Sequence, residues 1–139
     1  MKVQLVTPEE VAFEGEADSV SLPTEQGEIT VLAHHLPIVA TLGSGMMTVR
    51  SGTGEQYFAV SRGVVKVDQK TLLVLSDIAD RVDALDETAI EQAKERAQAL
   101  QKEKRDDAEG FAEATAILDR ELARLQSVRR HRARSRRTP

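Results

Sequence analysis

Hydrophobic and polar residues alternate along the first eighty residues of the chain. A period of two is typical of β-strands with one buried face. Turn residues separate the apolar segments, as at Ser51-Gly52-Thr53-Gly54 and Asp68-Gln69-Lys70, which predict two hairpins. The spacing leaves no room for crossover helices, so we predict an antiparallel β-sandwich or flattened barrel and not a parallel sheet. The predicted strands cover residues 3–7, 11–13, 19–22, 28–32, 38–42, 46–50, 55–60, 63–67 and 71–75.

After residue 84 the apolar period changes to three or four residues, which is typical of helices. Two stripes result, the first built mostly of alanine: Leu85, Ala89, Ala93, Ala97 and Leu100, then Phe111, Ala114, Leu118, Leu122 and Leu125. Asp86 can cap the first helix, and the charged segment 102–107 can turn the chain. We therefore predict an antiparallel helical hairpin. At ~25 cal/mol per Å2 an alanine seam contributes little, so we expect the hairpin to dock conditionally and not as a rigid domain.

The predicted fold class is α+β, with three parts: a sandwich over residues 1–84, a hairpin over 85–128 and an arginine-rich tail over 129–139. Residues 1–80 carry five basic and eleven acidic side chains, whereas six arginines fall within the last eleven residues. An acidic body with a basic end predicts a tail that seeks an acidic surface. We expect this tail to fray in isolation.

Composition excludes several classes of protein. The chain has no cysteine, which excludes disulfide scaffolds, thiolate zinc sites and cysteine nucleophiles. Aromatic residues make up 3%, which argues against a module that stacks bases on rings. No apolar run approaches the roughly 20 residues that span a bilayer, and acidic Glu9 and Glu10 lie where a signal peptide would be apolar. We expect a soluble intracellular chain.

Three segments resemble the opening of the epsilon subunit of bacterial F-type ATP synthase. They are Val6-Thr7-Pro8-Glu9, Phe13-Glu14-Gly15-Glu16 and Ser19-Val20-Ser21-Leu22-Pro23-Thr24-Glu25-Gln26-Gly27-Glu28-Ile29. Thr71-Leu72-Leu73-Val74-Leu75-Ser76-Asp77 is similar to the last sheet segment before the helices of that family. The resemblance covers residues 2 to 128 and implies a sandwich of about ten strands followed by a two-helix hairpin. The arginine-rich end lies beyond it.

The resemblance implies a non-catalytic rotor subunit that has no catalytic site and needs no cofactor. Such a subunit binds the gamma stalk and the c-ring and helps couple proton flow to ATP synthesis. It meets the membrane only through the complex, on the cytoplasmic face, and binds no nucleic acid. Its hairpin switches from a compact position beside the sandwich to an extended one, which restrains ATP hydrolysis in the alpha/beta catalytic head.

By the same resemblance, Glu28, His34 and His35 are candidate contacts to the c-ring and gamma side. Glu28 could instead be an ordinary solvated carboxylate. The family has proline and glycine where Ala33 and His34 stand, so less flexible residues must form this turn. The family also has glycine where Arg62 stands. The adjacent histidines point to opposite faces of an extended chain, so we expect no metal site. No nucleophile with a base and an orienting carboxylate is apparent.

Members of the family that bind ATP on the hairpin carry a motif at the start of the first helix. Leu85 and Asp86 match it, but Ala89 stands in place of an arginine and Ile90 in place of an alanine. Arg120 and Arg124 match positions that face phosphates, and Arg96 could join them, because guanidinium groups suit phosphate oxygens. The plain alternative is an exposed helix face. We predict weak or absent binding of regulatory ATP.

The tail is the sharpest functional hypothesis. When the hairpin extends, its arginines approach an acidic loop of the catalytic beta subunits, and contacts of ~0.3–1 kcal/mol each add up to a bias on a two-state hairpin. The candidate inhibitory residues are Arg129, Arg130, Arg132, Arg134, Arg136 and Arg137. A disordered solubilising tail is the plain alternative. The competing function is a free-standing β-sandwich binding module whose basic tail holds nucleic acid.

Overall fold

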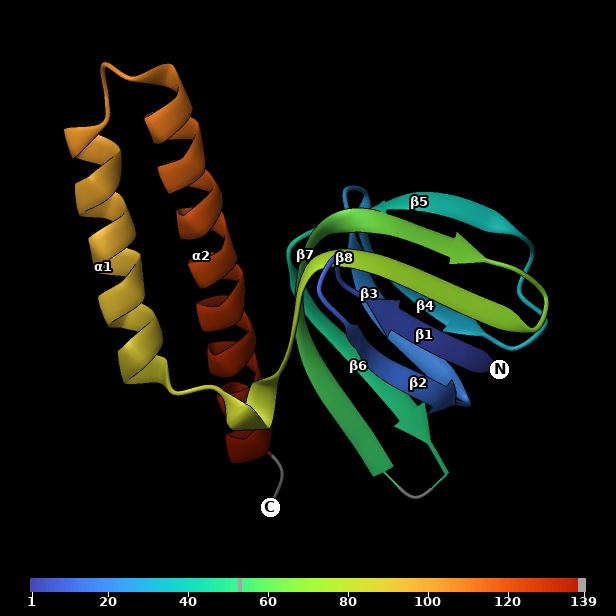
Figure 1. Cartoon of the computed structure of the whole chain (residues 1–139). Coiled ribbons are helices and arrows are strands. Elements are labelled where there is room, and N and C mark those ends of the chain that lie inside the picture. Colours follow the sequence, from blue (N-terminus) through green and yellow to red (C-terminus); the bar gives the residue numbers. More distant parts are fainter. Residues whose placement is uncertain (53, 138–139) are drawn as a thin grey trace.

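A computed structural model of the chain describes residues 1–52 and 54–137, with side chains to residue 134. Within these ranges it contains eight strands, one short 3-10 helix and two α-helices (Figure 1). The strands are β1 (Lys2–Val6), β2 (Val11–Glu16), β3 (Ser19–Thr24), β4 (Gly27–Leu32), β5 (Ile38–Leu42), β6 (Gly45–Ser51), β7 (Gly54–Val67) and β8 (Thr71–Arg81). The helices are η1 (Val82–Ala84), α1 (Glu87–Glu103) and α2 (Ala108–Arg137). The predicted sandwich followed by a helical hairpin is confirmed.

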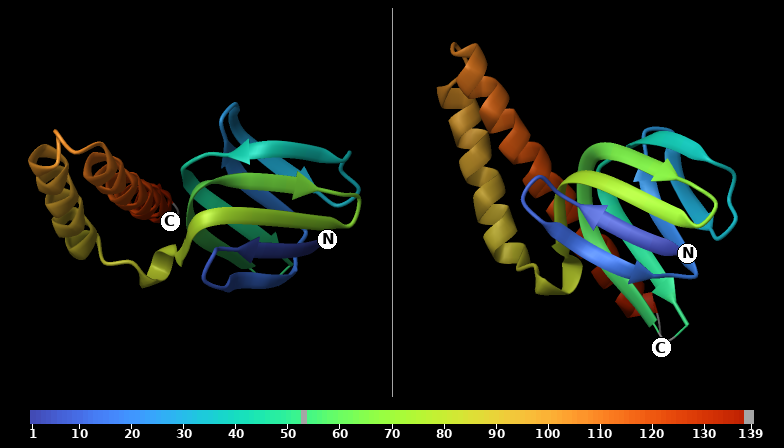
Figure 2. Two further views of the ribbon diagram at one scale, coloured as in Figure 1. Left: turned by 45° about the horizontal axis from the view of Figure 1, so that its top comes forward. Right: turned by 45° about the vertical axis from the view of Figure 1, so that its right-hand side comes forward.

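The strands form one sheet that bends over into two layers (Figure 2). The strand order is β2-β1-β8-β7-β5-β3-β4, and β6 pairs with β3 and β7. The first half of β7 pairs with β6 and the second half with β5, so β7 belongs to both layers. Large apolar side chains fill the space between the layers, and the rings of Phe13 and Phe58 meet there with centroids 5.7 Å apart. This is the main core of the protein.

Two details of the strand prediction are wrong. The predicted strands 55–60 and 63–67 are one continuous strand, β7, and β8 runs on to Arg81, so the structure has eight strands in its described ranges and not about ten. In addition, β1 and β8 pair in parallel, with Lys2 opposite Thr71. Closing the sheet brings the first strand beside the last, and this neighbour has no local signature in the sequence.

The bend of β7 and β8 lies at Ser61–Gly63, opposite Ser76–Ile78. Arg62 has a φ of +48°, in the left-handed region. A Cβ on Gly63 would lie 1.7 Å from the Leu75 carbonyl oxygen, so the strands can approach here only with glycine. The Ser76 hydroxyl, which is buried, accepts from the Ser61 amide (3.1 Å) and so satisfies backbone that the interrupted ladder leaves free.

The two helices stand beside the sandwich as an antiparallel pair, with α2 between α1 and the sheet in each view (Figures 1 and 2). The Asp86 carboxylate accepts from the Thr88 amide at 3.0 Å, which confirms the predicted cap. Residues 129–137 continue α2, where we expected the structured hairpin to end at residue 128. Whether this helical end frays in isolation stays a prediction. No helix in the described part of the chain is long and apolar enough to cross a membrane.

Candidate functional site

The described residues contain no group of three His, Cys, Asp or Glu side chains that could hold a metal ion. The candidate functional features are four surfaces: the ends of β4, the contact between α2 and the sandwich, the arginine-rich end of α2 and the uncovered face of the sheet layer that contains β1 and β2.

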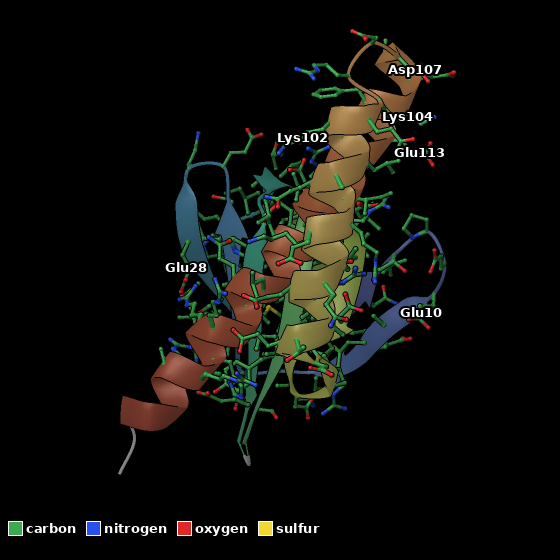
Figure 3. The ribbon with its side chains drawn as sticks, turned by 90° about the vertical axis from the view of Figure 1, so that its left-hand side faces the viewer. Glu10, Glu28, Lys102, Lys104, Asp107 and Glu113 are labelled. Carbon is green, nitrogen blue, oxygen red and sulfur yellow. The ribbon has the colours of Figure 1, made fainter. Side chains whose placement is uncertain are left out.

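Glu28 and the two histidines lie at opposite ends of β4. Glu28 is near its start, whereas His34 and His35 follow its last residue. At about 3.3 Å per residue this separates them by roughly 20 Å, so the three predicted contact residues do not form one cluster. Glu28 points along the side of the sandwich toward the lower part of α2, with Glu10 on the other side of the hairpin (Figure 3). Its carboxylate accepts from Arg130 at 2.7 Å.

The turn after β4 accommodates a histidine where the family has glycine. His34 has a φ of +66°, in the left-handed region. Its amide donates to the Gln69 carbonyl at 2.9 Å, which ties the turn to the β7–β8 hairpin. His35 Nδ1 lies 2.8 Å from the Leu36 carbonyl oxygen. The backbone thus fixes the turn at His34, and the neighbouring carbonyl holds the His35 ring.

Arg120 and Arg124, predicted to face phosphates, bind carboxylates of the sandwich instead. Arg120 donates twice to Asp77, at 2.7 and 3.3 Å, and this hydrogen bonding raises its pKa above the usual value. Arg124 donates to Asp80 at 2.7 Å and to Glu121 at 2.6 Å. Burial works against its charge, but these carboxylates outweigh burial and raise the pKa of Arg124. Both guanidinium groups are therefore fixed as cations with anionic partners.

The other residues of the predicted nucleotide set lie apart. Asp86 caps α1, Leu85 packs into the apolar contact beneath the hairpin, and Arg96 is exposed on α1. The hollow beside Arg120 and Arg124 is also lined by four carboxylates, those of Glu9, Glu10, Asp77 and Asp80. Four carboxylates outnumber two guanidinium groups, so this hollow disfavours a polyphosphate.

The described arginines at the end of α2 face carboxylates of this same chain. Arg129 donates to Glu87 at 3.0 Å and to Glu91 at 2.5 Å, and Arg132 also donates to Glu87. The pKa of Glu55 is lowered most by its hydrogen bond from the Tyr57 hydroxyl, next by Arg50 and least by the nearby charge of Arg134. The side chains of Arg136 and Arg137 lie outside the described residues.

An apolar row is exposed on the outer face of the sheet layer that contains β2, β1, the start of β8 and the end of β7. Four residues that lie next to one another across the strands form it: Val64, Leu75, Val6 and Val11. Val64 and Leu75 are each 44% exposed and Val11 is 55% exposed. α2 packs on β6 and β7 and leaves this row uncovered. Neighbouring exposed apolar side chains on one face are a candidate docking surface.

Sequence reasoning missed the acidic partners of the arginines. Asp77 and Asp80 come from β8, Asp119 from α2, and Glu87 and Glu91 from α1. These pairs join residues 38 to 57 positions apart, so no local pattern marks them. The one available signal is the spacing of Arg120 and Arg124, four residues apart on one helix face.

Comparison with known proteins gives a consistent answer. The profile of the family described as "ATP synthase, Delta/Epsilon chain, beta-sandwich domain" matches residues 1–82. The ATP synthase epsilon chain of Bradyrhizobium sp. (strain ORS 278) is 44% identical over 85 residues, 61% of this chain and 63% of the relative. The chain thus matches less than two thirds of the length of that relative. The ATP synthase epsilon chain of Dichelobacter nodosus (strain VCS1703A) is 33% identical over 137 residues, 94% of this chain and 96% of the relative.

Among solved structures, a chain in the cryo-EM structure of Euglena gracilis mitochondrial ATP synthase (OSCP/F1/c-ring, rotational state 1) has the same fold. The TM-score is 0.68 with 22% identity, over 84% of this chain and 74% of the other. At this identity the likeness concerns the fold alone. The profile covers more than half of the chain, and the Dichelobacter relative covers nearly all of it. This chain therefore belongs to the family of ATP synthase delta/epsilon chains.

Proposed function

We propose that this chain is a non-catalytic subunit of the central stalk of an F-type ATP synthase. It works at the cytoplasmic face of the membrane, which it meets only through the complex, and helps couple proton flow to ATP synthesis. The observation that carries this proposal is the pairing of two modules: a sandwich that matches the family over residues 1–82 and a helical hairpin packed against it.

The exposed apolar row offers a surface for the gamma subunit. Its side chains come from β7, β8, β1 and β2, which the main core holds rigidly in place. A preformed apolar surface suits a permanent contact with another stalk subunit. The c-ring contact would fall to Glu28 or to the His34–His35 turn, which are too far apart to serve one small patch.

The test is recovery of the complex from detergent-solubilised membranes with an affinity-tagged chain. We expect gamma, the c-ring and the alpha/beta head to be recovered with it. Leu75→Glu places a charge in the middle of the apolar row, so recovery should fall at least about tenfold, whereas the conservative Leu75→Met should leave it unchanged. A chain that recovers none of these subunits would refute the proposal.

The tail arginines are proposed to restrain ATP hydrolysis when the hairpin extends toward an acidic surface of the catalytic head. Six arginines in a continuous helical end support this, because their charges can act together. Deletion of residues 129–139 should raise ATP hydrolysis by the assembled enzyme at low salt. Hydrolysis that stays unchanged would remove the tail from the mechanism.

The prediction of weak regulatory ATP binding stands as a proposal, because the hollow beside Arg120 and Arg124 already holds four carboxylates. We expect Mg-ATP to bind the isolated chain no tighter than the millimolar range. A calorimetric titration measures this, and micromolar affinity would contradict it.

The competing function, a module that holds nucleic acid, requires DNA binding with a steep salt dependence. The carboxylates that face Arg129, Arg130 and Arg132 count against it.

A further inference from the structure

Two small apolar clusters attach the hairpin to the sandwich, separate from the main core. One joins Leu125 and Val128 of α2 with Ile90 of α1, Met46 of β6 and Val82 of η1. The other joins Ala123 with Ala59 and Ile78. Among the described residues these two clusters together hold eight buried residues, whereas the main core holds fifteen. Apolar burial therefore fastens the two helices less firmly than it holds the sheet layers together.

Charged pairs border this apolar contact where the sheet bends. Arg62 of β7 donates to Asp119 of α2, and the neighbouring Asp77 and Asp80 of β8 accept from Arg120 and Arg124. We call these six residues the bend latch. The sheet contributes one cation and two anions, and the helix contributes the reverse. This mixed polarity favours one register of α2, because a shift along the helix would bring like charges together.

The geometry of the sheet produces the latch. Arg62 and Asp77 lie between the pairs Ser61–Ile78 and Gly63–Ser76 of β7 and β8, at the bend that folds the sheet into two layers. The same backbone that takes the left-handed conformation at Arg62 directs its side chain to α2. The three sheet residues of the latch are thus held by the rigid module, whereas its three helix residues belong to the module that is held less firmly.

A second group of pairs holds the far end of α2. Arg129 and Arg132 bind Glu87 and Glu91 of α1, and Arg130 binds Glu28 of β4. The Arg130–Glu28 pair joins the hairpin to the sandwich, as do the approach of Arg134 to Glu55 and the ring contact of His131 with Tyr57. The pairs of α1 with α2 can persist when the hairpin moves as a unit, so release of the hairpin breaks the bend latch and these contacts at the end of α2.

We propose that the bend latch sets the fraction of molecules in which the hairpin is released from the sandwich. Each partly exposed pair stabilises docking only modestly and is screened by salt, but the pairs act together. The latch is therefore a reversible fastening that ions, or an acidic surface that captures the arginines, can open. Its consequence for regulation rests on the proposed function, because a released hairpin is the one that can reach a catalytic head.

A thiol reporter measures release in the full chain. The chain has no cysteine, and Ser127 is a fully buried residue of α2 whose hydroxyl donates to the Gly45 carbonyl at 3.1 Å. Ser127→Cys changes little volume and becomes reactive when α2 leaves the sandwich. Labelling by a small thiol reagent then reports the released fraction, under conditions where docking is fast relative to labelling.

In the Ser127→Cys chain, we expect the double substitution Asp77→Asn and Asp80→Asn to speed thiol labelling by roughly two- to fivefold for each ion pair removed. Glu14→Gln is the matched control, because Glu14 pairs with Lys2 within the sandwich, away from the hairpin. Raising KCl from ~0.05 to ~1 M shortens the screening length to about 3 Å, so it should speed labelling of the reporter chain more than labelling of the double variant. Labelling of the double variant at the control rate would overturn the proposal.

A double-mutant cycle separates a pairwise interaction from general damage to the fold. Asp77→Asn and Arg120→Gln should each speed labelling, and their combination should add little to either alone, because the two residues act through one contact. Additive effects would refute the latch. These measurements use the isolated chain, so their failure leaves the stalk proposal standing, and failure to recover the synthase leaves the latch standing.

Discussion

The sandwich and the hairpin are held in place by different physical forces. Between the sheet layers, large side chains such as Phe58, Leu22 and Met47 are almost completely buried. Between α2 and the sheet, two small apolar clusters and ion pairs share the contact. Apolar burial barely responds to moderate salt or to a charged partner, whereas ion pairs respond to both. One chain can thus combine a permanent anchor with an adjustable arm.

Among substitutions in the sandwich, Gly63→Ala should cause the largest loss of stability. The added Cβ would lie 1.7 Å from the Leu75 carbonyl oxygen, so the two strands must separate at the bend. We expect a loss of at least about 3 kcal/mol in the free energy of unfolding, measured by urea denaturation. Gly54→Ala is the control, because its Cβ would meet no atom within 4 Å. Equal, small losses in both variants would show that the bend is not rigid.

The two halves can be compared directly by removing one large side chain from each. Phe58→Ala should cost about 3–5 kcal/mol and weaken the whole sandwich. Leu125→Ala should cost less, since Leu125 borders a surface hollow into which neighbouring side chains can relax. Amide hydrogen exchange should then quicken in α2 while the β7 and β8 amides keep their protection. Equal loss of protection in both modules would mean that they unfold as one unit.

Much of this architecture could be predicted from the sequence. The change of period from two to three or four near residue 84 indicated the two modules, and the Asp86 cap indicated where α1 begins. The break between the predicted strands 55–60 and 63–67 falls at the bend, but no local pattern shows that the strand continues through Arg62 and Gly63. Continuous β7 therefore looked like two strands.

The candidate site was harder to predict than the fold. Arg120 and Arg124 stood out by their spacing, but their partners are set by how α2 lies on β8, which is a long-range property. The same holds for the tail, where Glu87 and Glu91 approach Arg129 only once the helices pair. Local patterns identify charges that need partners, and the tertiary structure selects those partners.

A smaller effect is expected at the turn after β4. His34 has a φ of +66°, a conformation that costs a non-glycine residue about 1 kcal/mol. His34→Gly relieves this cost but gives the unfolded chain more freedom, so we expect a net stabilisation of about 0.5 kcal/mol by thermal or urea denaturation. His35→Gly is the matched control, and it should destabilise by about 0.5–1 kcal/mol, because His35 needs no such relief. The opposite order would contradict the strain at His34.

The smallest predicted effect concerns the pKa of Glu55, near the end of α2. The Tyr57 hydroxyl donates to Glu55 and lowers the pKa of that carboxyl below its ordinary value of 4.5. A lowered folded-state pKa adds stability above pH ~4.5 that is lost as the pH falls through the folded value. Tyr57→Phe removes the donor, so the pKa of Glu55 should rise toward 4.5 in a carboxyl NMR titration, and the acid limb of stability should flatten. The Tyr57 ring also packs at a tilt of 46° against the ring of His131 of α2, with centroids 4.6 Å apart. Because phenylalanine keeps this ring contact, a change in hairpin release on Tyr57→Phe would show that the hydroxyl, and not the ring, supports docking at this end of α2.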